Sequence, residues 1–464
     1  MKKSSYLKVF FATTLMVSQS IDLFSQTNEV ERLAKTLGEH NVYEWSICPK
    51  STEAEQISNF EKLASIATDE ELIELLKSKN SVVTAYAFSA LVKREHDSLT
   101  SYLYDHLDDF RKLEVLMYGC DFIHGNQFET TVANFVLNES NDHINADDKT
   151  KIDSLLLFST RKYEFLAYLL NDKKFDKKYH DRIKELGVSH KYKSAPIALA
   201  RFQDTTDLKI LEKELYKNPY NTISLIEIFP HAFFKTFIST YGKKERKLDF
   251  MLYKAAAIYQ DTFALNFLTS EFNNLKDDYS GRESSQYLYE AVLKYKSPIY
   301  DSLFFDLWER NYLINDTLFL YLVGVNRERS EHLAVQSLKN INRLKSHSGV
   351  INEMLYYLVN TNKKTAQEII VEQLKGNKTL YYYPEFAENA RYFKEKEVVN
   401  ALFARLEIAD NAHIYYPIIE ALLYYKDDNI NEKLIETIKN NKEIDDWGFK
   451  KTKKILKEYN LTIE

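Results

Sequence analysis

Few residues of this chain have the types and spacing that chemistry requires. The densest group of metal-ligand types is Cys120, Asp121 and His124, but a structural zinc site needs four Cys or His ligands in close pairs. Ser159 and Lys162 match the S-x-x-K pattern, in which a lysine assists a nucleophilic serine. The companion motifs of that pattern are missing, so we interpret the match as chance.

Nucleotide and hydrolase motifs are missing from the sequence as well. The ten glycines are scattered, and none forms the G-x-x-x-x-G-K or G-x-G-x-x-G loops whose amides cradle phosphates. No G-x-S-x-G, H-E-x-x-H or EF-hand pattern occurs. The sequence therefore predicts no catalytic, cofactor-binding or metal-binding residue, no cofactor, and a protein that is not an enzyme. Asp and Glu are abundant, so a hydrolase or lyase with a carboxylate-lined groove stays open.

Cys48 and Cys120 are the two cysteines of the chain. In an oxidising compartment they could form a disulfide, which would stabilise the fold by about 4 kcal/mol on the chain-entropy estimate. Two buried free thiols are the alternative, because the sequence does not measure the distance between the two side chains. Both states stay open.

An aromatic residue recurs where the first helix of each predicted repeat ends. The candidates for an aromatic ladder are Tyr259, Tyr295, Tyr392 and Tyr424. A packing tyrosine would seal each turn with its ring and keep its hydroxyl in water, whereas a ladder would line a groove for a peptide or a sugar. The lysine-rich segment 450–457 is either a solvated helix face, whose cations offset the helix dipole, or a docking patch for an acidic partner.

The elements that position these residues repeat along the chain. Segment 388–406 matches segment 420–438, and segment 255–272 matches segment 291–308. Apolar residues at positions i, i+4 and i+8 of such segments form one stripe of a helix. A single pair of antiparallel helices cannot bury this stripe, so the repeats must stack into a continuous array.

The N-terminal part carries clear helix signals. Thr68 and Glu71 form a capping box, and the chain has only 10 Gly and 7 Pro among 464 residues, which favours long helices. The block 80–94, Asn-Ser-Val-Val-Thr-Ala-Tyr-Ala-Phe-Ser-Ala-Leu-Val-Lys-Arg, resembles a HEAT repeat. It is similar to repeats of exported, uncharacterised HEAT-repeat proteins of Bacteroidota, over roughly residues 50–140 and more weakly to the end. The resemblance implies a helical-repeat fold and no catalytic residues.

The first residues are typical of a secretory signal peptide. Lys2, Lys3 and Lys8 precede a short apolar run at residues 9–17, and small residues follow. That run is too short to span a bilayer, and no later apolar run is long enough, so we expect no transmembrane anchor after removal of residues 1–26. A formal charge of −6 gives no attraction for nucleic acid. We expect an exported protein, either periplasmic or secreted.

Together these patterns predict an all-α fold, a right-handed α-solenoid of HEAT-like helix pairs with a period of about 32–36 residues. Residues 27–140 would form N-terminal HEAT-like repeats with an irregular loop near residues 110–126, and residues 141–464 would continue the array. Such arrays present extended surfaces, so we expect a non-catalytic scaffold for an unknown protein or peptide partner. A carbohydrate- or cell-wall-binding module is the alternative.

Overall fold

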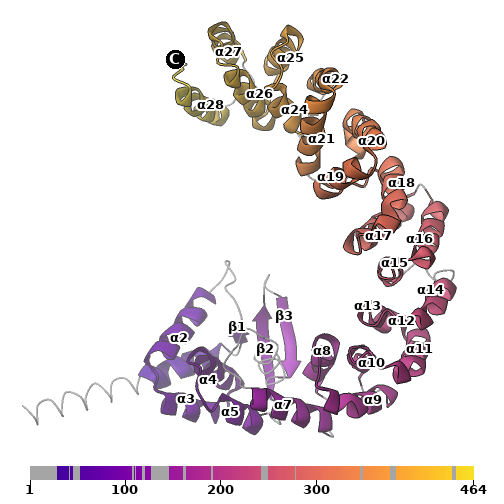
Figure 1. The fold of residues 1–464 in the computed structure, drawn as a ribbon. Coiled ribbons are helices and arrows are strands. Elements are labelled where there is room, and N and C mark those ends of the chain that lie inside the picture. The colour runs from indigo at the N-terminus through magenta and orange to yellow at the C-terminus, as the bar shows by residue number, and fades with distance from the viewer. Residues whose placement is uncertain are drawn as a thin grey trace, which may run out of the picture. The chain divides into compact units, whose positions relative to one another are not determined.

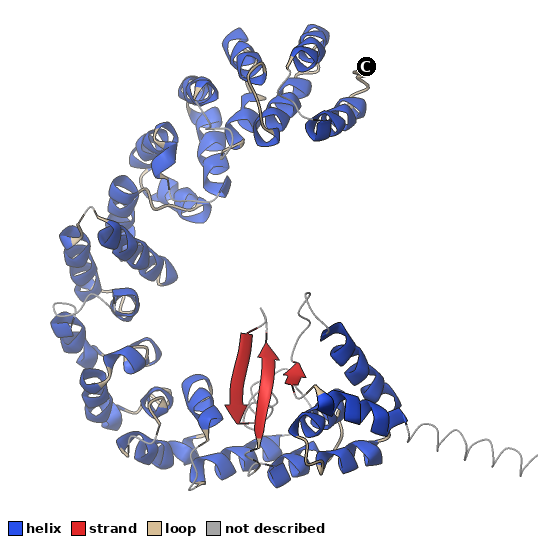
Figure 2. Cartoon of the chain, turned by 180° about the vertical axis from the view of Figure 1, so that it is seen from behind, coloured by secondary structure: helices blue, strands red, loops and turns tan. Residues whose placement is uncertain are grey.

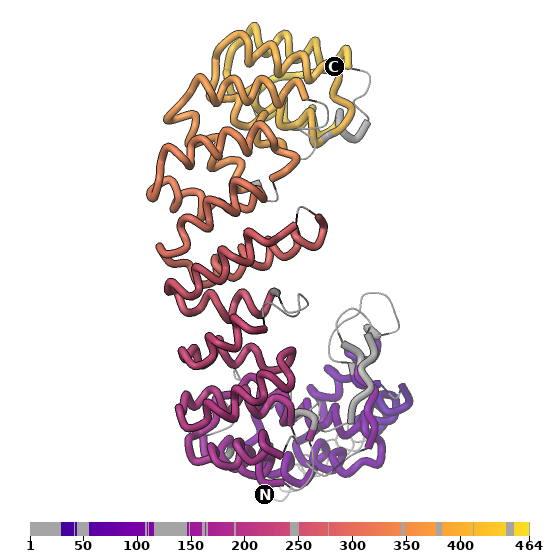
Figure 3. The backbone as a smooth tube through the Cα atoms, turned by 90° about the vertical axis from the view of Figure 1, so that its right-hand side faces the viewer, coloured from indigo at the N-terminus to yellow at the C-terminus, as the bar shows by residue number. Residues whose placement is uncertain are grey.

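The structure, a computed structural model, consists of two compact units, Met1–Phe229 and Pro230–Glu464. In both units the backbone turns back and forth through successive helices (Figure 3). The predicted signal peptide, Cys48 and Cys120 lie outside the described residues. The structure describes residues 29–40, 42–44, 53–106, 109, 111–117, 121–126, 146–159, 163–189, 192–241, 249–276, 278–344, 348–376, 383–441 and 446–463.

Helices dominate the described part of the chain. It contains a helix at residues 29–39, 25 further α-helices and one three-stranded sheet (Figures 1 and 2). The helices pack in sequential pairs, as in a helical solenoid, and the predicted fold class is therefore confirmed. Among the described residues no helix is long and apolar enough to cross a membrane.

The first unit starts, in its described part, with a helix at residues 29–39. The capping box is confirmed: the Glu71 amide donates to Thr68 Oγ1 over 3.2 Å, and the Thr68 amide donates to Glu71 Oε2 over 2.8 Å. These bonds satisfy backbone amides that a helix start leaves without partners. The further helices of this unit are α2 (Glu53–Ile66), α3 (Asp69–Leu76), α4 (Ser81–Lys93), α5 (Leu99–His106), α7 (Ala146–Phe158), α8 (Glu164–Asp172), α9 (His180–Val188), α10 (Ala195–Ala200), α11 (Leu208–Lys217), α12 (Pro219–Thr222) and α13 (Leu225–Ile228), with 3-10 turns η1 (Lys177–Tyr179) and η2 (Thr205–Asp207).

The second unit has two layers of helices in its C-terminal part. Helices α19, α21, α24, α26 and α28 each contact the next along one layer, and α20, α22, α25 and α27 do so along the other (Figure 1). The elements of this unit are η3 (Ala232–Phe234), α14 (Lys235–Tyr241), α15 (Asp249–Ala257), α16 (Thr262–Asn274), α17 (Tyr279–Lys294), η5 (Pro298–Tyr300), α18 (Asp301–Asn311), α19 (Asp316–Val325), α20 (Arg327–Lys339), η6 (Ile341–Arg343), α21 (Ser348–Thr361), α22 (Lys363–Lys375), α24 (Glu385–Ala390), α25 (Lys396–Leu406), α26 (Ala412–Tyr424), α27 (Asp428–Asn440) and α28 (Asp446–Glu458).

The core lies between the two layers, where the predicted stripes meet. Each buried aliphatic side chain contributes roughly 1.5–3 kcal/mol to folding. Five stripe residues of α25 and α27 are buried: Val398, Leu402, Leu406, Leu434 and Ile438. Ile430, at the start of the stripe on α27, is half-buried.

The predicted irregular loop near residues 110–126 is wrong for most of its length. Strand β2 (Lys112–Met117) pairs antiparallel with β3 (Asp121–Asn126), and β1 (Val42–Glu44) pairs parallel with β2 (Figure 2). Leu113 and Val115 are buried, whereas Lys112 before them and Glu114 between them are exposed. This alternation has the period of two that a half-buried strand requires, and the neighbouring glycines obscured it.

Hydrogen bonds from side chains connect one repeat to the next. Tyrosine hydroxyls and side-chain amides donate to backbone carbonyl oxygens of a neighbouring repeat, most of which lie at the C-terminal ends of helices. Four hydroxyls and two amides do so over 2.7–3.2 Å: Tyr179 to Thr150, Tyr259 to His231, Tyr300 to Ala257, Tyr425 to Ala390, Gln373 to Leu338 and Asn441 to Leu406.

Candidate functional site

Two of the four ladder candidates belong to the turns of their repeats. Tyr259 and Tyr295 are half-buried. The Tyr259 hydroxyl donates to the His231 carbonyl over 2.7 Å, Lys235 Nζ lies 5.0 Å from its ring centroid, and burial raises its pKa. The Tyr295 carbonyl accepts a hydrogen bond from the Gln260 side chain over 3.0 Å. These contacts hold consecutive repeats together.

The other two candidates, Tyr392 and Tyr424, are exposed and share one arginine. They lie at the C-terminal ends of α24 and α26, which are neighbours in one layer. The Arg391 guanidinium lies 5.0 Å from the Tyr392 ring centroid and 5.5 Å from that of Tyr424. One of its nitrogens also donates to the Tyr392 hydroxyl over 3.1 Å. A cation at this distance is attracted to the negative face of an aromatic ring.

Two further exposed tyrosines, which are not among the ladder candidates, belong to the same helix layer. Tyr356 lies on α21 and Tyr459 directly follows α28. The four tyrosines are 36, 32 and 35 residues apart, and this regular spacing is the signal that could have found the outer two. We call them the tyrosine face: Tyr356, Tyr392, Tyr424 and Tyr459, with 58, 36, 50 and 41% of their surface exposed.

A hollow of about 170 Å³ lies within the tyrosine face. Tyr424, Tyr459 and Pro417 supply aromatic and apolar lining, and one guanidinium and three carboxylates supply charge. One positive and three negative charges give the lining a net charge of −2. The charged residues are Glu388 from α24, Glu420 from α26, Glu458 from α28, and Arg391.

These carboxylates have no basic partner among the described residues. Glu420 and Glu458 are exposed and Glu388 is half-buried. Elsewhere in the described part of the second unit, four acidic side chains have basic partners: Asp261 with Lys235, Asp306 and Glu309 with Arg329, and Glu395 with Lys363. The hollow therefore presents charge to solvent that the fold does not neutralise.

A second cluster, in the first unit, satisfies its own charges. Asp207 is fully buried; it accepts from His180 Nε2 and from Lys184 Nζ, each over 2.6 Å. The other ring nitrogen, His180 Nδ1, is 3.0 Å from an Asp181 carboxylate oxygen. Burial opposes the charged imidazole, but hydrogen bonds to Asp181 and Asp207 outweigh it and raise the pKa of His180. With both nitrogens engaged, His180 has no free lone pair with which to act as a general base.

A larger hollow, of about 570 Å³, lies beside this cluster. Phe202, in its lining, packs edge-on against the His180 ring at 5.1 Å. Arg201, also in the lining, donates to the Leu170 and Asn171 carbonyls at the end of α8. The side chains that face this hollow thus close turns of adjacent helix pairs.

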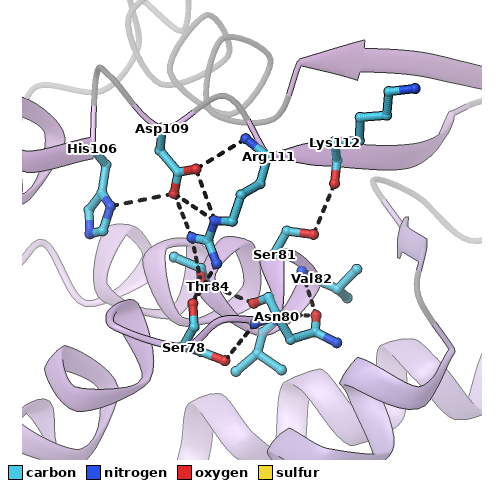
Figure 4. Close-up of polar contacts among 10 residues, drawn as sticks. Ser78, Asn80, Ser81, Val82, Thr84, His106, Asp109, Arg111 and Lys112 are labelled. Atoms are coloured by element: carbon cyan, nitrogen blue, oxygen red, sulfur yellow. Dashed lines mark hydrogen bonds and ion pairs between the residues drawn. The ribbon is translucent and has the colours of Figure 1, made fainter.

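A third polar cluster clamps strand β2 onto the turn before α4 (Figure 4). Arg111 donates from Nε to Asp109 Oδ1 over 2.9 Å and from one terminal nitrogen to the Ser78 carbonyl. His106 Nδ1 is 3.8 Å from an Asp109 oxygen, beyond hydrogen-bond distance, and burial lowers its pKa. Burial opposes ionisation of Asp109, but hydrogen bonds from Arg111 lower its pKa below the usual range. The arrangement ties the sheet to the helix.

The sequence predicts no metal site, and Cys120 of the group of metal-ligand types lies outside the described residues. Asp121 and His124 lie on β3, where His124 pairs with Glu114 and Asp121 with Met117 across the ladder. In the part of the chain that the structure describes, no three His, Cys, Asp or Glu side chains are placed to hold a metal ion.

Comparisons with known proteins identify no family. No protein-family profile matches the chain, and no curated protein matches it. Among solved structures, a crystal structure of an engineered protein is similar at 14% sequence identity, covering 94% of this chain and 99% of that one, with a TM-score of 0.23. A score this low carries no argument, and the class of this chain, an all-helical repeat-like protein, follows from its own helices.

Proposed function

We propose that this chain is an exported, non-catalytic, HEAT-like repeat scaffold that binds a protein or peptide through the tyrosine face. The observation that carries the proposal is the regular exposure of four tyrosines along one helix layer, on or within two residues of α21, α24, α26 and α28. Export rests on the predicted signal peptide, and the HEAT-like assignment on the resemblance of residues 80–94.

Tyrosine suits a binding surface of this kind. Its large, rigid ring offers contact area at low entropic cost, and its hydroxyl offers a hydrogen bond, so tyrosine and arginine are enriched at interface hot spots. The tyrosine face combines four such rings with Arg391. Repetition on successive helices would let a long ligand make several similar contacts.

The two alternatives have less support. A carbohydrate module would stack sugars on exposed ring faces, but Arg391 already covers part of the Tyr392 and Tyr424 rings. A hydrolase or lyase would use the carboxylates of the hollow, such as Glu420 and Glu458. These are exposed, whereas acid–base catalysis favours enclosed sites that perturb the pKa of the catalytic groups.

A retention experiment with a matched control tests the proposal. The mature chain, residues 27–464, is immobilised and exposed to the native envelope fraction, alongside a Tyr392→Ala/Tyr424→Ala variant. The control variant, Tyr168→Ala/Tyr220→Ala, removes two exposed tyrosines of the first unit. We expect a stoichiometric protein that the wild type and the control retain and the face variant loses. Retention of glycan alone, or of the same protein by all three chains, would contradict the proposal.

A further inference from the structure

We propose that the ligand of the tyrosine face is an extended, basic peptide with a Lys or Arg at every third residue. This inference rests on the proposed function of the face and specifies the chemistry of the partner. Charge, ring geometry and helix spacing each lead to it.

Charge selects the sign of the ligand. The hollow carries a net charge of −2, and its three carboxylates lack basic partners among the described residues. A Lys or Arg of a ligand would pair with them, whereas an acidic peptide or a nucleic acid backbone would be repelled. Such exposed pairs contribute modestly one by one, so several in a row are needed for useful affinity.

Ring geometry shows that the face accepts a cation between its tyrosines. Arg391 lies over the rings of Tyr392 and Tyr424 at 5.0 and 5.5 Å. Tyr424 and Tyr459 both line the hollow together with Glu420 and Glu458. A second guanidinium or ammonium group there would meet aromatic rings and carboxylates at once, which is the combination that recognises cations in aromatic cages.

Helix spacing selects the register of the ligand. The carboxylates come from α24, α26 and α28, which are successive helices of one layer, and packed helices lie roughly 8–10 Å apart. A polyproline II segment rises about 3.1 Å per residue with three residues per turn. Every third side chain therefore points the same way at intervals of roughly 9 Å, which matches one basic side chain to each helix.

Fluorescence anisotropy with the full mature chain tests this inference. The probe is a labelled peptide of four Lys-Pro-Pro repeats, compared with a peptide of the same composition whose lysines are consecutive and with one that has Glu in place of Lys. The face variant is Glu388→Gln/Glu420→Gln/Glu458→Gln. The control variant, Glu372→Gln/Glu397→Gln/Glu432→Gln, makes the same charge change at exposed positions of the other layer, on α22, α25 and α27.

Of the three peptides, we expect the spaced-lysine peptide to bind the wild type most tightly. Its affinity for the face variant should be at least about fivefold lower than for the wild type, and its affinity for the control variant should stay within about twofold of the wild-type value. Equal weakening in both variants, or no preference for spaced lysines, would overturn the inference. If no basic peptide binds while retention of a partner still requires Tyr392 and Tyr424, the inference fails and the proposed function stands. Tyrosine-dependent binding of peptidoglycan fragments without peptide binding would overturn both.

Discussion

The hollow beside Asp207 in the first unit and the hollow in the tyrosine face of the second unit use charged residues in opposite ways. In the first unit, the buried Asp207 carboxylate binds both His180 and Lys184, and Arg201 donates to backbone carbonyls. In the second unit, three carboxylates and Arg391 line a hollow without pairing with one another. A cluster that satisfies its own charges stabilises the fold, whereas unpaired charge among exposed tyrosines is available to a ligand. The volume of a hollow is therefore a poor guide to a binding site here, because the hollow of the first unit, whose charged residues pair within the fold, is the larger of the two.

The largest expected effect is on stability, at the first hollow. Asp207→Ala removes the shared partner of His180 and Lys184 and leaves two cations near a buried position. We expect the free energy of unfolding to fall by about 3 kcal/mol, measured by denaturant titration. Asp181→Ala, at a carboxylate exposed to solvent, is the matched control and should have little effect. A loss no larger than that of the control would contradict the structural role of the cluster.

The same cluster predicts a pH dependence with a definite sign. Because the pKa of His180 is raised in the folded state, the proton stabilises the fold at low pH. That contribution is complete below the unfolded pKa of about 6.5 and is lost as pH rises through the folded pKa. The difference in melting temperature between wild type and His180→Gln should therefore shrink as the pH rises above about 6.5. A difference that does not vary with pH would argue against a charged His180.

Substitutions at Tyr259 and Tyr424 distinguish a tyrosine that packs between repeats from one that is exposed for binding. Tyr259→Phe removes the hydroxyl that donates to the His231 carbonyl and should lower the free energy of unfolding by about 1 kcal/mol. Tyr424→Phe, on the exposed face, should leave stability unchanged. Thermal melts of both variants check this, and equal losses would mean that the two residues do not differ in role.

The smallest effect is expected at Arg391. Arg391→Ala removes the one positive charge of the hollow and uncovers the Tyr392 and Tyr424 rings. Affinity for the spaced-lysine peptide should therefore rise, by about twofold to fivefold, in the anisotropy assay. A fall in affinity would instead mean that Arg391 contacts the ligand directly.

The sequence predicts those features of the structure that depend on local, periodic patterns of residues. The stripe of Val398, Leu402 and Leu406 and the capping box at Thr68 depend on spacings within one helix, and both are confirmed. The β2 and β3 strands were missed because only Leu113 and Val115 mark the alternation. The contact between His180 and Asp207 joins residues 27 positions apart, and no local pattern predicts it.

The candidate site shows the same limit. Repeat spacing placed Tyr259, Tyr295, Tyr392 and Tyr424 in equivalent positions, but exposure depends on how each helix is rotated and on what the next repeat contributes. Tyr259 is half-buried and its hydroxyl donates to a carbonyl of the neighbouring repeat, whereas Tyr424 keeps 50% of its surface exposed. The sequence alone carries no measure of that rotation.

Site-specific photo-cross-linking tests the central claim most directly. The photoreactive residue p-benzoylphenylalanine would replace Tyr392 or Tyr424 of the tyrosine face and, as a control, Tyr168 of the first unit, in cells that export the protein. The account predicts a discrete protein adduct from the two face positions and none from Tyr168. Adducts to glycan alone, or the same adducts from all three positions, would contradict it.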